Sequence, residues 1–225
     1  MPNVSIKMDE KSIQIINEDC MNVLKDISDN YFDLAIVDPP YQIKRNSKRG
    51  DENRLEKNLK YINKYKLQTW DIKPNKKYFD ELFRVSKKQI IWGANNFNLP
   101  TTEYFIVWDK HQTVNNFASA EYAWTNVPKP AKIFRHTIHQ VMQDRKSEGG
   151  KIHPTQKPVA LYRWLLENYA NPNNKIIDTH LGSGSSAIAA HYFGINEFLG
   201  IEIDKEYFDL AKDRFEKSTR QLQLI

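Results

Sequence analysis

The sequence contains one cysteine, Cys20, among its 225 residues. A single thiol excludes an internal disulfide framework and suits a reducing cytoplasm. No apolar run approaches the roughly 18 residues that a membrane-spanning helix needs, and the first residues carry Lys7, Asp9, Glu10 and Lys11 where a signal peptide would be apolar. We therefore expect a cytoplasmic protein that is not embedded in a membrane.

The chain also lacks internal repeats and low-complexity segments. Its length is enough for one α/β domain with a substantial core and too short for two ordinary domains. We expect a single domain over residues 1–225, carrying two inserted polar segments at 42–68 and 110–150.

Positive charge is concentrated in one part of the chain. The net charge is only +5, but residues 42–66 hold nine Lys or Arg against three acids. A solvated surface can produce such a run, and so can a site for a phosphate backbone. The basic residues nearest the start of this segment are Lys44, Arg45, Lys48 and Arg49.

Apolar periodicity predicts alternating strands and helices, the pattern of an α/β fold. Strands are predicted at 12–17, 33–37, 89–92, 104–108, 121–125, 175–178 and 198–203. Helices are predicted at 21–27, 78–85, 159–169, 186–193 and 207–215.

One of these strands ends abruptly. Residues 34–37 form an apolar run that stops at Asp38, and the two following prolines cannot donate a ladder hydrogen bond. The carboxyl end of a strand is where open α/β sheets place their ligands. Asp38 and the carbonyl group of Pro39 offer free acceptors, and Tyr41 offers a flat ring. Together they describe a pocket for a nucleobase with an exocyclic amino group.

The sequence Asp38-Pro39-Pro40-Tyr41 resembles the DPPY motif of the amino-methylating DNA methyltransferases, which use S-adenosylmethionine. The resemblance implies that these four residues form the catalytic motif. A plain strand followed by a Pro-Pro turn is the alternative reading of these residues alone.

A glycine-bearing loop follows the strand at 175–178. Gly182, Gly184 and Ala187, with Glu202 about 20 residues after the first glycine, fit the dinucleotide fingerprint G-x-G-x-x-A followed by an acid. That reading predicts a nicotinamide or flavin nucleotide. Asp178 would repel a pyrophosphate, however, whereas it suits a cofactor that carries an ammonium and a sulfonium group. A plain strand-to-helix turn is the remaining alternative.

The segment 178–184 resembles the cofactor-binding motif of the same methyltransferases, with Thr179 and His180 where proline and phenylalanine are usual. The segment 153–158 resembles their HPTQKP motif. The resemblance implies S-adenosylmethionine as cofactor and no metal. The implied cofactor-binding residues are Asp178, Thr179, His180, Leu181, Gly182, Ser183, Gly184, Glu202, Thr155, Gln156 and Lys157, and also Asp19, for which a helix cap is the alternative.

The order of the three motifs matches the circularly permuted class called beta. The resemblance therefore implies a Rossmann-like, seven-stranded, mostly parallel sheet with helices on both faces. It also implies a site-specific enzyme that flips its target base out of double-stranded DNA, and DPPY favours adenine over cytosine. Arg135 and Arg145 are candidate base readers, and lysines are candidate phosphate contacts.

Other functions stay open at this point. The chain could methylate the amino group of cytosine, act on RNA, or bind DNA without turnover, since Thr179 and His180 depart from the family pattern. The residues leave open a homodimer and a cognate restriction endonuclease as partners, and they do not predict the recognition sequence.

Overall fold

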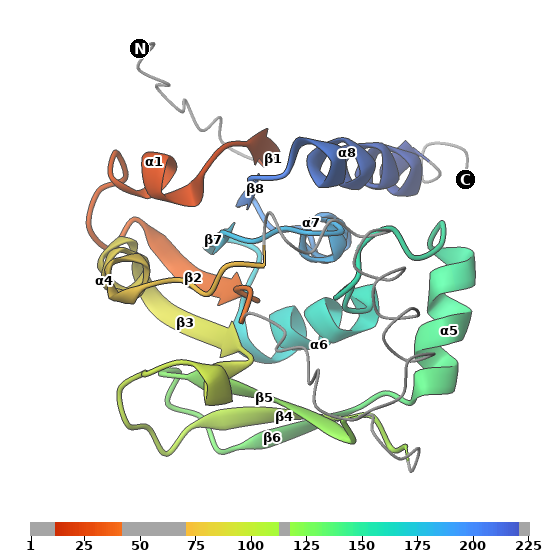
Figure 1. Cartoon of the computed structure of the whole chain (residues 1–225), viewed down its shortest axis with the longest axis horizontal. Coiled ribbons are helices and arrows are strands. Elements are labelled where there is room, and N and C mark those ends of the chain that lie inside the picture. Colours follow the sequence, from red (N-terminus) through yellow and green to blue (C-terminus); the bar gives the residue numbers. More distant parts are fainter. Residues whose placement is uncertain (1–11, 42–70, 113–117, 221–225) are drawn as a thin grey trace, which may run out of the picture.

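The computed structural model describes residues 12–41, 71–112 and 118–220, and one eight-stranded sheet runs through them (Figure 1). The strands are β1 (Ser12–Asn17), β2 (Phe32–Val37), β3 (Ser86–Trp92), β4 (Phe105–Asp109), β5 (Ala120–Thr125), β6 (Lys132–Arg135), β7 (Lys175–Asp178) and β8 (Glu197–Glu202). The helices are α1 (Cys20–Leu24), α4 (Lys76–Val85), α5 (Ile138–Ser147), α6 (Val159–Tyr169), α7 (Ser185–Phe193) and α8 (Lys205–Arg220), with a short 3₁₀ turn, η1 (Ala94–Asn96).

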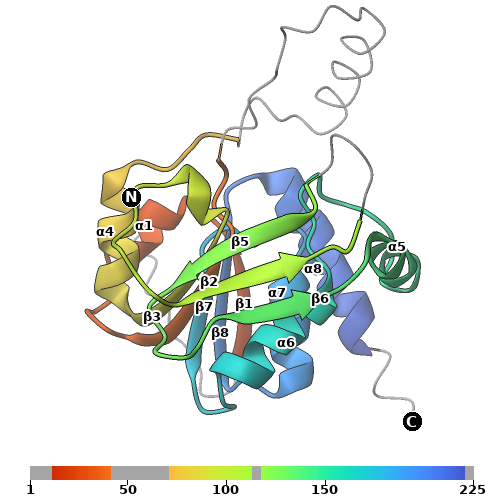
Figure 2. The ribbon, with the colours of Figure 1, turned by 90° about the horizontal axis from the view of Figure 1, so that it is seen from below.

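The strand order in the sheet is β1-β8-β7-β2-β3-β5-β4-β6. The first five strands of this order pair in parallel, β5 is antiparallel to both of its neighbours, and β6 pairs in parallel with β4. Figure 2, seen from below, shows β5, β4 and β6 together at one end of the sheet. From β7 the chain proceeds towards β8, and from β2 it proceeds towards β3, so the order reverses between β7 and β2. This reversal is the topological switch point at which open α/β sheets bind ligands.

The central strands are buried on both faces, which explains why they are apolar throughout. In β2, Leu34 and Ile36 pack into one core, and Ala35 and Val37 pack into the other. The first core lies under α6 and α7, and the second lies under α1 and α4. The sheet is therefore a central layer between two layers of helices.

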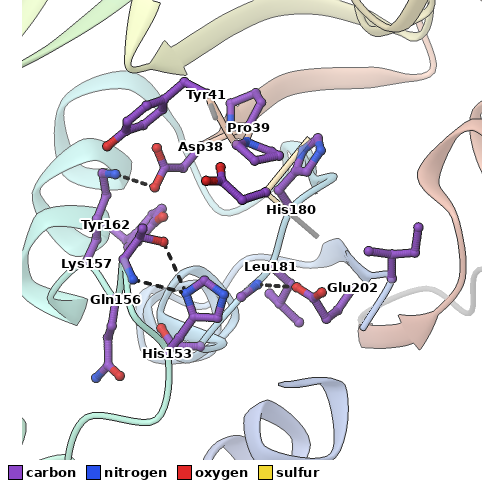
Figure 3. Close-up of a pocket in the computed structure, with 16 residues that line it drawn as sticks. Asp38, Pro39, Tyr41, His153, Gln156, Lys157, Tyr162, His180, Leu181 and Glu202 are labelled. Carbon is purple, nitrogen blue, oxygen red and sulfur yellow. Dashed lines mark hydrogen bonds and ion pairs between the residues drawn. The ribbon is translucent and has the colours of Figure 1, made fainter. Parts of the chain in front are cut away.

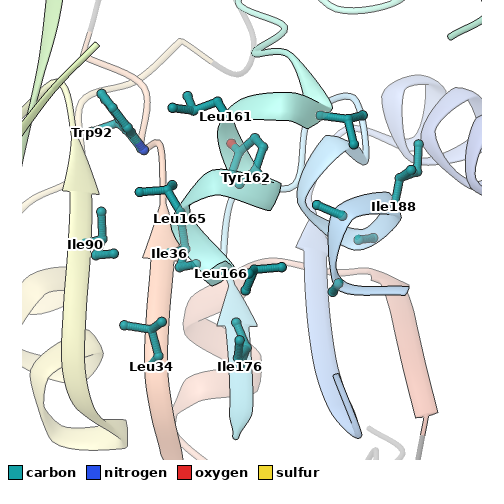
Figure 4. Close-up of a cluster of buried hydrophobic side chains, with 14 of the residues drawn as sticks. Leu34, Ile36, Ile90, Trp92, Leu161, Tyr162, Leu165, Leu166, Ile176 and Ile188 are labelled. Atoms are coloured by element: carbon teal, nitrogen blue, oxygen red, sulfur yellow. The ribbon is translucent and has the colours of Figure 1, made fainter. Parts of the chain in front are cut away.

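Helix α6 supplies a large part of the first core. Its residues Leu161, Leu165 and Leu166 are buried, and they face the side chains of Ile36 and Trp92 across the sheet surface (Figure 4). The spacing of these leucines, four residues and then one, places them on one side of the helix.

The predicted fold is confirmed, with differences at several elements. Helix α6 and strands β1 and β7 have the expected bounds, whereas α1 ends at Leu24 and α8 continues to Arg220. The sheet has eight strands where seven were expected, because β6 was missed, and α5 was also missed. Strand β6 is only four residues long, and α5 buries Val141 alone, so neither has a strong periodic signal. In the ranges that the structure describes, no helix is long and apolar enough to cross a membrane.

The turn from β7 into α7 is organised by Asp178. This side chain is buried, its Oδ2 accepts from Ser186 Oγ at 2.6 Å, and its Oδ1 accepts from the backbone N–H of His180 at 3.1 Å. Burial raises the pKa of Asp178 to about 7, although both hydrogen bonds oppose that shift. The carboxylate thus connects the end of the strand to the first turn of the helix.

Replacement of Leu165 by alanine should destabilise the protein, because the side chain is fully buried between α6 and the sheet. We expect a loss of about 2–5 kcal/mol in the free energy of unfolding, measured by urea denaturation. The same substitution at Leu210, which is exposed on α8, should change stability by no more than about 0.5 kcal/mol. Equal losses in the two variants would contradict the packing of α6.

The raised pKa of Asp178 predicts a pH dependence of stability. The folded protein holds this proton more tightly than the unfolded chain, whose pKa is about 3.9, so the stabilisation is complete at low pH and is lost as pH rises towards 7. Asp178→Asn lacks this titration. Between pH 5 and pH 8 the wild type should therefore lose on the order of 2 kcal/mol relative to the variant. Urea unfolding of both proteins at pH 5 and pH 8 measures this difference in the free energy of unfolding. The prediction would be contradicted if the stabilities of the two proteins changed equally with pH.

Candidate active site

A pocket opens at the carboxyl ends of β2, β7 and β8, at the switch point of the sheet (Figure 3). Its empty space, including the open mouth, is about 660 Å³. The lining residues come from segments that are far apart in sequence: Asp38, Pro39, Pro40, Tyr41, Asp71, His153, Thr155, Gln156, Lys157, Tyr162, His180, Leu181, Gly182, Ser183, Glu202 and Ile203. The three motifs found in the sequence thus meet at one pocket.

Asp38 and Lys157 form an ion pair at the pocket, and both side chains are largely shielded from solvent. Lys157 Nζ donates to Asp38 Oδ2, joining the end of β2 to the segment that precedes α6 (Figure 3). Burial raises the pKa of Asp38, and the ammonium group of Lys157 opposes that shift. Burial alone would lower the pKa of Lys157, but Asp38 and Glu121 together raise it above its ordinary value, so the lysine carries its charge at neutral pH.

The second oxygen of Asp38 differs from the first in its surroundings. Asp38 Oδ1 is buried and, within the part of the chain that the structure describes, has no hydrogen-bond partner. A buried acceptor without a donor is costly and uncommon in folded proteins. Because Asp38 lines the pocket, a donor group brought by a ligand would satisfy this atom.

The ring of Tyr41 rests against the backbone at the end of β3. Gly93 adopts a positive φ of 66°, and a Cβ atom built there would lie 2.9 Å from Cδ1 of Tyr41. Only glycine allows both this backbone conformation and this close approach. Gly93 is therefore a supporting residue of the pocket that the sequence analysis missed, and a glycine directly after a predicted strand was the available signal.

The glycine loop between β7 and α7 is tied to the end of β8. The backbone N–H of Gly182 donates to Glu202 Oε2 at 2.8 Å, and the N–H of Asp204 donates to Glu202 Oε1 at 2.9 Å. Glu202 is buried and lines the pocket. The backbone of Ile203 also bonds this carboxylate, and these three bonds leave part of its acceptor capacity unused. Gly184, also at a positive φ, follows the loop as the N-cap of α7 and does not line the pocket.

The two residues that depart from the family pattern pack together with Tyr78 of α4. Thr179 Oγ1 lies 2.7 Å from the hydroxyl of Tyr78 and 3.0 Å from Nδ1 of His180. Burial lowers the pKa of His180 to about 3, so its ring is neutral at pH 7. Of the three residues only His180 lines the pocket, and the Asp178 side chain is turned into the β7–α7 turn.

The segment 153–158 contributes four residues to the lining of the pocket: His153, Thr155, Gln156 and Lys157. The ring of His153 packs edge-on against that of Tyr207, with 4.4 Å between the ring centroids, and Thr155 donates to its Nδ1 from both Oγ1 and the backbone. The side chain of Gln156 bonds the backbone of Ile152 and Gly150. Thr155, Gln156 and Lys157 all line the pocket, and the side chain of Lys157 bonds Asp38.

The remaining predicted residues lie away from the pocket or outside the described ranges. Asp19 caps α1, accepting from the N–H of Met21 at 2.9 Å, and does not line the pocket. Arg135 is exposed at the end of β6, with its Nε 3.6 Å from Asp109 Oδ2. Arg145 of α5 donates to the carbonyl group of Gln156. The predicted contacts Lys44, Arg45, Lys48 and Arg49, and the segment 42–68, lie outside the described residues.

Comparison with known proteins gives relatives over most of the chain. The Type II methyltransferase M.HpaI of Haemophilus parainfluenzae is 24% identical over 245 residues, which cover 90% of this chain and 74% of that protein. The putative methylase YubD of Escherichia coli (strain K12) is 24% identical over 230 residues and is covered to 93%, as is this chain.

Solved structures share the fold. TTHA0409 from Thermus thermophilus, a putative DNA modification methylase in complex with S-adenosyl-L-methionine, is 19% identical, with a TM-score of 0.55 over 91% of this chain and 95% of that one. The cytosine-N4-specific PvuII DNA methyltransferase is 13% identical, with a TM-score of 0.58 over 95% of this chain and 94% of that one.

A family model described as DNA methylase matches residues 70–213. This match includes the segment 153–158, the glycine loop and Glu202, which line the pocket opposite the Asp38 motif. Because the model matches more than half of the chain, this protein belongs to the N6 and N4 family of DNA methylases.

Proposed function

We propose that this protein transfers a methyl group from S-adenosylmethionine to the exocyclic amino group of a base in DNA. The observation that carries the proposal is Asp38 Oδ1, a buried acceptor without a hydrogen-bond partner in the described ranges, on a residue that lines the pocket. An exocyclic amino group is a donor with two hydrogens, so it satisfies this atom. A reaction at an amino nitrogen needs such an acceptor to bind the hydrogens of the amino group.

The residues present fit the cofactor. The pocket presents Asp38, Asp71 and Glu202 against the single cation Lys157 among its described lining residues, a set that suits a ligand with an ammonium and a sulfonium group better than a pyrophosphate. We propose that Glu202 accepts from the ribose hydroxyls with its remaining acceptor capacity and that the backbone of 181–183 lies along the methionine part. Thr155, Gln156 and His180 would form the remaining wall. When bound, S-adenosylmethionine supplies the methyl group.

The catalytic work of the chain is then positioning and electrostatics. Asp38 Oδ1 and the carbonyl group of Pro39 accept the two amino hydrogens and favour a nitrogen whose lone pair is less delocalised into the ring. Tyr41 stacks on the base. Lys157 holds the carboxylate of Asp38 in one orientation and opposes the rise in its pKa that burial causes. These fixed charges need no rearrangement during the reaction.

We propose double-stranded DNA as the substrate, with the target base flipped out of the stack at a cost of a few kcal/mol. Residues 1–225 would act as one methyltransferase domain. Lys44, Arg45, Lys48 and Arg49 would contact the phosphate backbone, and the segment 110–150, with the exposed Arg135, would contribute to sequence recognition. Arg145 is the weaker candidate because its guanidinium group bonds the carbonyl group of Gln156.

Adenine is the base that we propose. The support is the acid of the DPPY motif, since serine takes this place in many cytosine-directed relatives. The fold does not distinguish the two bases, because the cytosine-N4-specific PvuII enzyme shares it. Methylation of cytosine or of RNA, and binding of DNA without turnover, are the other outcomes that the experiments below separate. A homodimer and a cognate restriction endonuclease remain proposals as partners.

An assay of methyl transfer tests the reaction itself. Incubation of the wild type with labelled S-adenosylmethionine and unmodified genomic DNA, followed by nucleoside mass spectrometry, should yield N6-methyladenine. N4-methylcytosine as the product would correct the base. If DNA takes no label, RNA is tested in the same assay, and product there would correct the substrate. No product on either, with cofactor still bound in calorimetry, would leave a DNA-binding protein without turnover.

Asp38→Asn should reduce transfer at least about 100-fold. Lys157 is held where it donates, so it will bond the amide oxygen and leave the amide NH₂ at the place of Oδ1. A donor would then oppose the amino group of the base. Asp213→Asn, which removes a carboxylate from an exposed ion pair on α8, is the matched control and should leave transfer unchanged. Full activity of a folded Asp38→Asn protein would refute the assigned role.

Glu202→Gln should weaken cofactor binding about tenfold, the effect of losing one charge-assisted hydrogen bond. Isothermal titration calorimetry with S-adenosylmethionine measures it. Glu216→Gln, an exposed residue paired with Arg220 on α8, is the control for the same chemical change. Unchanged affinity in Glu202→Gln would remove the ribose contact from the proposal.

A further inference from the structure

The ion pair of Asp38 is the inner end of a longer row of charges. Lys157 Nζ lies 3.3 Å from Glu121 Oε2, and Glu121 Oε1 accepts from Lys110 Nζ at 2.5 Å. Cations and carboxylates therefore alternate from Lys110 through Glu121 and Lys157 to Asp38. The side chains are shielded from solvent, with exposed fractions of 15%, 26%, 5% and 12% in that order. Interactions at such positions are screened far less than at the surface.

The outer half of this row belongs to the antiparallel end of the sheet. Glu121 lies on β5, and Lys110 directly follows β4, where its backbone N–H donates to Ser119 at 2.9 Å. The ammonium group of Lys110 also lies 4.8 Å from the ring of Trp108. Neither Glu121 nor Lys110 lines the pocket. These two residues therefore act on the reaction through their effects on Lys157 and on the charge of Asp38, without lining the pocket themselves.

Glu121 restrains the position of the lysine charge. An ammonium group has three donors, and one of them would otherwise be available to the second oxygen of Asp38. Glu121 is a second carboxylate that attracts the same ammonium group, and Lys110 holds Glu121 in turn. The geometry leaves Lys157 on Oδ2 and Oδ1 without a partner in the described ranges.

We propose that Glu121, held by Lys110, is a positioning residue that keeps Lys157 off Asp38 Oδ1, so that this oxygen stays available to the amino group of the target base. The inference rests on the proposed function, because it concerns the acceptor for that amino group. It adds two residues outside the three motifs to the machinery of the reaction.

The proposal has a signature in the pH profile. The groups that act on Asp38 are Lys157, Glu121 and Lys110, with Asp178, Tyr41 and Tyr162 near by. The negative charge of Glu121 raises the pKa of Asp38, and the positive charge of Lys157 lowers it. If transfer needs ionised Asp38, removal of the charge at 121 shifts the acidic limb of the rate profile to lower pH. Removal of the charge at 157 shifts that limb to higher pH.

The test is single-turnover methyl transfer, measured over a range of pH with cofactor-loaded protein. Glu121→Gln should lower the rate constant about tenfold or more, because Lys157 then also engages Oδ1. The Kd for S-adenosylmethionine should stay within about twofold of the wild type, since Glu121 does not line the pocket. The acidic limb should shift to lower pH in Glu121→Gln and to higher pH in Lys157→Gln.

Glu216→Gln controls for the chemical change and should match the wild type in all three measurements. The inference would be overturned if Glu121→Gln had the rate constant of the wild type and the same acidic limb in its pH profile. It would also be overturned if a lowered melting temperature were the only defect of this variant. If Glu121→Gln does not fold, Lys110→Gln carries the test: Glu121 then draws Lys157 away from Asp38, and the limb should shift to higher pH. An inactive wild type would count against the proposed function instead, which separates the two failures.

Discussion

The buried ion pair between Asp38 and Lys157 is the constraint on which the pocket depends. Two charges removed from water must compensate each other closely, because either one alone would be strongly destabilising. The pair joins segments that are 119 residues apart in sequence, the end of β2 and the approach to α6. It fixes where the pocket lies, and it determines which oxygen of Asp38 is left to a ligand.

The sheet places this pair at its topological switch point. Strands β7 and β2 are neighbours whose onward connections diverge, so their carboxyl ends leave a gap that no crossover fills. Asp38 closes one side of the gap and the glycine loop closes the other. The two prolines after Asp38 stop β2 there and keep its acceptors out of any ladder. The two prolines therefore both end the strand and leave the acceptors of Asp38 available to a ligand.

Thr179 and His180, which differ from the usual family residues, find hydrogen-bond partners within the structure. Their polar groups bond each other and the hydroxyl of Tyr78, so the substitution of two apolar family residues leaves a hydrogen-bonded cluster beside the pocket. His180 is neutral at pH 7 because burial lowers its pKa to about 3. The pocket wall consequently gains polarity without gaining a charge, which is compatible with a cationic cofactor.

The sequence by itself determined the features that depend on local order. Apolar periodicity predicted α6, and the Pro-Pro stop predicted the end of β2, because both are properties of neighbouring residues. Three features were decided only by the tertiary structure. Lys157 forms an ion pair with Asp38 in addition to lining the pocket, and the side chain of Asp178 bonds within the β7–α7 turn. Strand β6 pairs with β4 and so joins the sheet. Each of these depends on contacts between segments distant in sequence, where charge pairing and edge pairing leave no periodic signal in either segment.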